Sequence, residues 1–141
     1  MSISTLAVYD INSFLAADSS LQTIAGKTMP FFPIVGDGSE TAPFVVYFIS
    51  QNTPSVEAWW NRFDSVAYVV YDTNIDRLLK IGERVIELLS KGDYISGPSG
   101  KTGTDTRLFS TSFDGSSVGE AIERDGWFTM NLEFTIYYVA K

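Results

Sequence analysis

Apolar residues recur at helical spacing in two separate stretches of the chain. In the first stretch they return every three or four positions, which predicts an amphipathic helix from Leu6 to Ala17. Asp18-Ser19-Ser20 interrupts the pattern and can cap a second short helix, Leu21 to Ala25, that ends at Gly26. The chain is therefore expected to begin with two consecutive helices.

The second stretch has the clearest helical periodicity in the sequence. Its predicted helix carries one apolar stripe, formed by Ile75, Leu78, Leu79, Gly82, Val85, Ile86 and Leu89. Thr73 or Asn74 can cap the start of this helix, and Gly92 stands just past its end. Because Gly82 costs about 1 kcal/mol of helix propensity relative to alanine, we expect it to allow close packing of the helix on a sheet.

Other apolar runs predict strands. Phe44 to Ile49 and Val66 to Tyr71 are apolar on both faces and rich in β-branched and aromatic residues, which places the second run in the interior of a sheet. Leu108 to Phe113 is a third predicted strand. Trp127 to Val139 alternates between apolar and polar residues, which predicts a long antiparallel strand with one buried face. Its length suggests a bend at a bulge, or ends that pair beyond the subunit.

The remaining segments are expected to connect these elements. Prolines keep Met29 to Val35 extended, and Gly36 to Ser39 is a polar turn. Gln51 to Asp64, Lys91 to Arg107 and Asp114 to Gly126 are predicted loops. Together the elements predict one α+β domain over residues 1–141: an antiparallel or mixed sheet of about four strands, with two helices packed on one face.

Composition excludes several classes of protein. Of the 141 residues, 45% are hydrophobic and 14% are aromatic, which is enough to build a packed core. No stretch approaches the ~20 consecutive apolar residues of a membrane helix. The first residues have no basic segment before an apolar run, so we expect no signal peptide. The chain contains no cysteine, which is typical of a protein that folds inside the cell.

Histidine is absent as well, which removes the Ser-His-Asp triad and the commonest transition-metal ligand. Asp64, Asp72 and Asp76 stand around one predicted strand and the following helix start, so Asp72 and Asp76 could approach each other and hold a hard cation, but each of the three has an ordinary turn or helix-start role. Gly100-Lys101-Thr102 ends like a phosphate-binding loop, yet Ile95 stands where that motif needs its first glycine. We therefore predict no catalytic residue, no metal site and no cofactor, and the protein is not expected to be an enzyme.

The charge of the chain indicates whether it is suited to bind nucleic acid. The net charge is -7, from 17 acidic and 10 basic residues, and the basic residues are scattered singly. Without a basic cluster to neutralise phosphates, a role in gripping DNA or RNA is not expected. An acidic surface suits a conduit that must not hold DNA, although mild acidity also keeps a domain soluble. Arg77 and Arg84 are predicted to lie on the solvated outer face of their helix.

Two adjacent tryptophans, Trp59 and Trp60, stand in a polar connection together with Phe63. Their side chains diverge in a strand and in a helix, so one is expected to be structural and the other to anchor an interface. The alternative is that both are buried under a long loop. We take Trp59, Trp60 and Phe63, with Lys101 and Arg107 of the second loop, as the candidate interface residues.

The order of the elements and the residues that fill them resemble the tail terminator, or tail completion, proteins of long-tailed bacteriophages. The strand Pro43-Phe44-Val45-Val46-Tyr47 after the helix pair is the most specific part of the resemblance. The segments that carry it are Ile11 to Gly26, Phe32-Pro33, Ala42 to Tyr47, Ser65 to Leu89 and Trp127 to Val139. The paired tryptophans and the loop Lys91 to Arg107 have no counterpart in this pattern.

The resemblance implies a structural virion protein that forms a ring, usually a hexamer, at the neck end of the tail. Such a ring ends polymerisation of the tail tube and joins the tail to the head. The implied partners are further copies of the chain, the tail tube protein and the head-tail connector or neck protein, with the sheath protein as a further candidate. DNA would pass through without specific binding, and no membrane is involved. The protein would be made in the cytoplasm of the bacterial host.

Two other classes of function are open from the residues alone. One is a monomeric adaptor domain that binds a peptide or a sheet edge through its aromatic residues. The other, less favoured, is an enzyme that uses carboxylates and Mg²⁺. Self-association at micromolar concentration separates the ring from the adaptor, and thermal stabilisation by the metal would reveal the enzyme.

Overall fold

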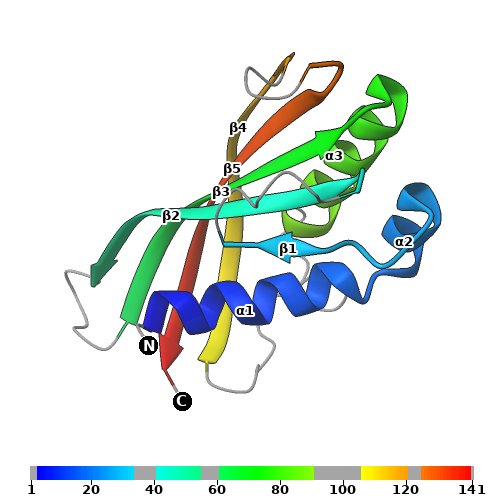
Figure 1. Cartoon of the computed structure of the whole chain (residues 1–141). Helices are drawn as coiled ribbons and strands as arrows, with labels where there is room; N and C mark the ends of the chain where they lie inside the picture. The colour runs from blue at the N-terminus through cyan, green and yellow to red at the C-terminus, as the bar shows by residue number, and fades with distance from the viewer. Residues whose placement is uncertain (1–2, 34–40, 55–60, 91–105, 121–124, 141) are drawn as a thin grey trace.

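A computed structural model describes most of the chain, and a five-stranded sheet with helices packed on one face dominates it (Figure 1). The described residues are 3–33, 41–54, 61–90, 106–120 and 125–140. The helices are α1 (Ile3–Ala16), α2 (Ser19–Ala25) and α3 (Ile75–Ser90). The strands are β1 (Phe31–Phe32), β2 (Phe44–Pro54), β3 (Asn61–Asp72), β4 (Thr106–Glu120) and β5 (Phe128–Ala140). The α+β class is confirmed.

Both ends of α2 and the start of α3 follow the predicted capping residues, whereas α1 begins at Ile3, before the predicted Leu6, and Gly92 lies outside the described residues. The Asp18 carboxylate accepts a hydrogen bond from the Leu21 N–H at 2.9 Å, which caps α2. Gly26 ends α2 in the left-handed conformation, with φ of 78°. At the start of α3, the Asn74 side-chain oxygen accepts hydrogen bonds from the N–H groups of Asp76 and Arg77. Asn74 is therefore the cap of α3.

The strands lie in the order β1-β2-β3-β5-β4. All neighbours are antiparallel except β1 and β2, which are parallel. The fifth strand, β1, is a two-residue segment that the sequence predicts only as extended. Both ends of β5 pair within the chain, Phe128 with Glu120 and Ala140 with Thr106. The prediction that these ends pair beyond the subunit is therefore wrong, and the bulges lie in the partner strand β4 instead.

Three strands are longer than their hydrophobic pattern predicts. The predicted loop from Gln51 to Asp64 is strand up to Pro54 and again from Asn61, because β2 and β3 pair along their polar ends. The predicted loop from Asp114 is strand as far as Glu120, since β5 provides a continuous partner. In each case the ladder satisfies backbone N–H and C=O groups whatever the side chains are. Hydrophobic patterning cannot report such extensions.

The helices cover one face of the sheet and form the main core with it (Figure 1). The buried residues of α3 are Leu78, Ile81, Gly82, Val85 and Leu89, whereas Ile75 and Leu79 are 36% and 43% exposed. The predicted stripe is thus correct in part, and the buried side of α3 is turned toward Ile81. From the sheet, the largest contributors are Tyr68, Leu132, Phe134 and Ile136.

Two contacts fix the helices on the sheet. A Cβ at Gly82 would overlap the sulfur atom of Met130 on β5, which confirms that this glycine allows close approach. On α1, the buried Asn12 side-chain oxygen accepts a hydrogen bond of 2.8 Å from the Tyr68 hydroxyl. This bond satisfies two polar groups inside the core, where an unpaired one would be costly.

The opposite face of the sheet carries no helix among the described elements. Near the start of β2, a small second cluster lies on this face, with Phe44 and Tyr71 stacked at 4.9 Å between ring centroids. Val46, Phe32, Val69 and Trp127 complete the cluster. Among the helices of the described residues, none has the length and apolar character needed to cross a membrane.

Candidate assembly surfaces

The strands that lead into the predicted interface loops meet at one end of the sheet. The register pairs Pro54 with Arg62, Asn61 with Val139, and Thr106 with Ala140. The β2–β3 connection and the segment before β4 therefore open at the same end. Two loops that are far apart in sequence thus leave the sheet from neighbouring positions.

Of the candidate interface residues, Trp59, Trp60 and Lys101 lie outside the described residues. The backbones of Phe63 and Arg107 are described, on β3 and β4. Arg107 pairs with Val139, whose other partner, Asn61, stands two residues before Phe63. The fold therefore brings the backbones of Phe63 and Arg107 to the same end of the sheet, although they lie on strands that are not adjacent.

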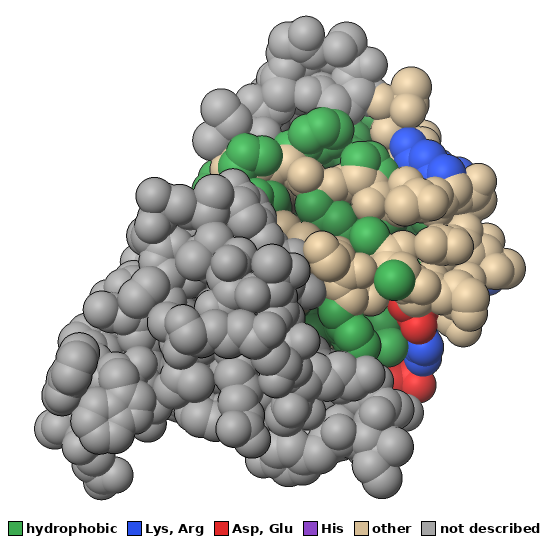
Figure 2. All heavy atoms as spheres, turned by 90° about the horizontal axis from the view of Figure 1, so that it is seen from below, with side chains coloured by type: hydrophobic (Ala, Val, Ile, Leu, Met, Phe, Trp, Pro, Cys, Tyr) green, Lys and Arg blue, Asp and Glu red, His purple; other side chains and the backbone are tan. Residues whose placement is uncertain are grey.

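Figure 2 shows the face seen from below in the orientation of Figure 1. In its described part, hydrophobic side chains gather along the border with the grey residues, while the few charged side chains lie toward the opposite margin (Figure 2). Basic side chains are too sparse on this part of the face to form the stripe expected of a phosphate-binding surface.

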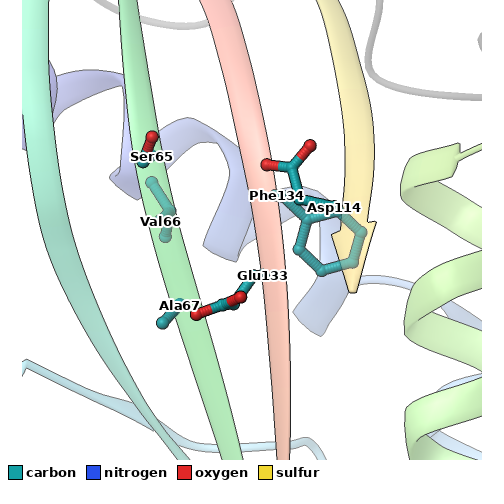
Figure 3. Close-up of a pocket in the computed structure, with 6 residues that line it drawn as sticks. All are labelled: Ser65, Val66, Ala67, Asp114, Glu133 and Phe134. Atoms are coloured by element: carbon teal, nitrogen blue, oxygen red, sulfur yellow. The ribbon is translucent and has the colours of Figure 1, made fainter. Parts of the chain in front are cut away.

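The open face of the sheet has a polar hollow over β3, β5 and β4 (Figure 3). Its volume is about 210 Å³, and it is lined by Ser65, Val66, Ala67, Asp114, Glu133 and Phe134. Asp114 is the extra residue at a register shift in β4, and its carboxylate accepts a 2.6 Å hydrogen bond from the Thr135 hydroxyl. With two carboxylates and no basic group in its lining, the hollow is suited to accept hydrogen bonds rather than to hold an anion.

Asp72, a candidate metal ligand in the sequence, belongs to an ion pair. Its carboxylate is fully buried and accepts hydrogen bonds from Nε and Nη2 of Arg77 at 2.7 and 2.6 Å. The Asn74 N–H donates a third. The prediction that Arg77 lies on a solvated face is correct only in part, because the side chain is 32% exposed but reaches back over the helix start. The hydrogen bond to Asp72 raises the pKa of Arg77.

The rest of that carboxylate set does not complete a metal site. Asp76 is exposed, and the side chain of Asp64 lies outside the described residues. Within the part of the chain that the structure describes, no group of three acidic, cysteine or histidine side chains is placed to hold a metal ion.

Arg84, the other arginine predicted to lie on the solvated face of its helix, is also paired with acidic side chains. Its guanidinium donates two hydrogen bonds of 2.9 Å to Asp18 and one of 3.1 Å to Glu87. Asp18 thus caps α2 and also ties α2 to α3. The hydrogen bond from Arg84 is the main cause that lowers the pKa of Asp18. Sequence periodicity misses both arginine pairs, because each depends on where the acidic partner lies in the fold.

Four large hydrophobic side chains are exposed among the described residues: Phe48, Ile75, Leu79 and Val118. Phe48 and Val118 belong to β2 and β4, and they are 42% and 48% exposed. Val118 has no signal in the sequence, since it stands in a Gly/Ser-rich segment predicted to be a loop. Scattered exposed hydrophobic residues are ordinary, but these two lie on the strands near opposite edges of the sheet.

The fold is shared with a solved virion structure. No protein-family model matches the chain, and no curated protein matches it in sequence. A chain in the structure of the virion of a native gene transfer agent (GTA) particle matches with a TM-score of 0.68 at 13% identity. The match covers 94% of this chain and 93% of that chain. At this identity the likeness establishes the fold, along nearly the full length of both chains.

Proposed function

We propose that this chain is a structural virion protein that caps the tail tube as a ring, with six copies as the expected number. One observation carries the proposal: a chain of a virion particle has the same fold over 94% of this sequence. The order of helices and strands at the N-terminus, which resembles phage tail terminator proteins, adds the position at the neck end of the tail. Residues 1–141 would act as one domain in this role.

The described surfaces support a protein that binds proteins. Basic residues form no cluster in the sequence, and the net charge is -7, so the ring would let DNA pass without holding it. Each copy in a ring needs two different matching surfaces, because the contacts are heterologous. We assign the loops around Trp59-Trp60 and Lys91 to Arg107, which leave the same end of the sheet, to contacts with the ring neighbour or the tube.

The partners in this role are further copies of the chain, the tail tube protein and the head-tail connector or neck protein. The sheath protein is a further candidate. No catalytic step or cofactor is part of the proposal. The protein would act in the neck of the virion after synthesis in the bacterial host.

Binding to tail tubes tests this function. Fluorescently labelled protein is added to tail tubes purified from the particle that contains the chain, and the bound label is located by electron and light microscopy. We expect label at one end of each tube, and shorter tubes when the protein is present during polymerisation. Label along the whole tube, or none on tubes, would contradict the proposal.

Substitution of the tryptophans tests the proposed interface. At least one of the substitutions Trp59→Ala and Trp60→Ala is expected to reduce binding to the tube end at least tenfold, because tryptophans dominate binding energy at interfaces. Ser13→Ala, an exposed change on α1, is the control. Circular dichroism of each variant shows whether the fold persists. If both tryptophan variants unfold, the residues are structural and the interface assignment is wrong.

A further inference from the structure

The sheet has two edges that no other described strand covers. On one side, β4 is the last strand, and in the described residues nothing pairs with its outer edge along Thr106–Glu120. On the other side, β1 pairs only with Val45 and Val46 of β2. The outer edge of β2 from Phe48 to Pro54 is therefore also without a described partner strand.

Both edge strands contain bulges, but each also has a regular stretch without charged residues or proline. Natural edge strands are blocked by bulges, lysine, proline or inward-pointing charges, or are kept very short. The stretch from Gly115 to Gly119 on β4 contains no charged residue and no proline, and it pairs with β5 without a register shift. Its Ser116, Ser117 and Val118 are exposed. On β2, the only proline is Pro54 at the very end.

The directions of the two edges are complementary. Going from β2 to β4 across the sheet crosses three antiparallel pairs, so β4 runs opposite to β2. In a ring whose axis runs parallel to the strands, rotation from one copy to the next leaves the direction of every strand unchanged. The β4 edge of one copy therefore meets the β2 edge of the next in antiparallel orientation, the arrangement found in the rest of the sheet apart from β1.

We propose that successive copies of this chain join by pairing β4 of one copy with β2 of the next, so that the sheet continues from subunit to subunit. The occupant of each edge is a second copy, because the same molecule offers two different free edges of matching polarity, as a closed heterologous ring requires. The inference rests on the proposed ring and specifies its contact. Backbone hydrogen bonds would supply affinity, and exposed side chains such as Phe48 would be covered at the joint.

Engineered cysteines test the contact, since the natural chain has none. Ser112 on β4 and Gln51 on β2 occupy the same row of the sheet, linked through Thr135 and Ser65. Three strand spacings of ~4.8 Å separate them within one copy, about 14 Å in all, which is beyond the reach of a disulfide. Any disulfide between these positions therefore joins two copies.

The double variant Ser112→Cys/Gln51→Cys is oxidised under assembly conditions and run on a denaturing gel. We expect a ladder from dimer to the full ring, whereas each single variant gives no ladder. Phe48→Cys and Thr53→Cys, each combined with Ser112→Cys, cover the adjacent registers on the same face, because the register shift between Ile49 and Gln51 places Ile49 on the helix-covered face. Efficient dimers from Ser112→Cys alone would mean that β4 pairs with itself, which overturns the proposal.

Light scattering of the wild-type protein separates this contact from the ring itself. If the wild-type protein has the mass of a ring but none of the three double variants forms cross-links, the edge pairing is overturned and the proposed ring still stands. A monomer at every concentration, both alone and with tail tubes present, overturns both. As a second variant, Ser117→Lys places a charge on the β4 edge, and we expect it to raise the concentration for half-assembly at least tenfold. Ser13→Lys, with the same exposed residue type on α1, should leave assembly unchanged.

Discussion

At the scale of single residues, charged side chains in the described fold form ion pairs that the sequence pattern does not predict. Asp72 and Arg77 lie five positions apart and pair across the start of α3, and Arg84 joins Asp18 from 66 residues away. The caps Asp18 and Asn74 are predictable because a cap acts on its own neighbours in the chain. The ion pairs are not, because periodicity places a residue on a face without naming its partner.

The buried carboxylate of Asp72 makes Arg77 important for stability. Arg77→Gln is expected to lower the free energy of unfolding by about 2 kcal/mol, since it leaves a buried charge without its partner. The guanidinium is partly exposed, so the loss should be below that of a fully buried pair. Urea unfolding at neutral pH measures it. Lys80→Gln, an exposed change one turn away, is the control and should cost under about 0.5 kcal/mol. Equal losses in the two variants would contradict the prediction.

The Asp18–Arg84 pair gives stability that depends on pH. The pKa of Asp18 is lowered in the folded state, so its contribution is present above the unfolded pKa of about 3.9 and is lost as the pH falls through the folded pKa. Asp18→Asn keeps a capping oxygen but removes the charge. We expect it to cost about 1 kcal/mol at pH 7 and progressively less below pH ~4, measured by urea unfolding at each pH. A cost that is the same at pH 7 and at pH 3 would rule out the ion pair as its source.

At the scale of elements, the long periodic segments were predictable and the strand ends were not. The helices at the N-terminus and α3 follow from apolar spacing. The alternation in β5 correctly predicts one buried face, which Met130, Leu132, Phe134 and Ile136 form. The polar ends of β2, β3 and β4 are strands because a neighbouring strand pairs with them. That information lies in the tertiary structure. The same is true of the rotation of α3 about its own axis, which buries Ile81 and exposes Leu79.

The contact between α3 and β5 can be tested at Gly82. Gly82→Val should lower the free energy of unfolding by about 2 kcal/mol, because the new side chain overlaps Met130. Met130→Ala makes room, so the double variant should lose at least ~1 kcal/mol less than the sum of the single variants. Denaturant unfolding of all four proteins in this cycle gives the coupling. Additive losses would show that the two residues do not press on each other.

At the scale of the whole molecule, helices cover one face of the sheet, and no described strand pairs with the outer edge of β4 or with that of β2 from Phe48 onward (Figure 1). The candidate interface residues chosen from the sequence belong to segments that the strand register brings to one end of the sheet. The sequence could not point to the edges of β4 and β2, since an edge exists only once the strand order is known. In the proposed ring these two edges are the two different surfaces that a heterologous contact requires.

The mass of the purified protein in solution, by light scattering after size-exclusion chromatography across a concentration series, tests the ring most directly. The account predicts a species of about six times the 15.6 kDa of one chain, populated increasingly as the concentration rises through the micromolar range. A single species of 15.6 kDa at every concentration, up to the highest that stays soluble, would contradict self-assembly into a ring and favour the monomeric adaptor.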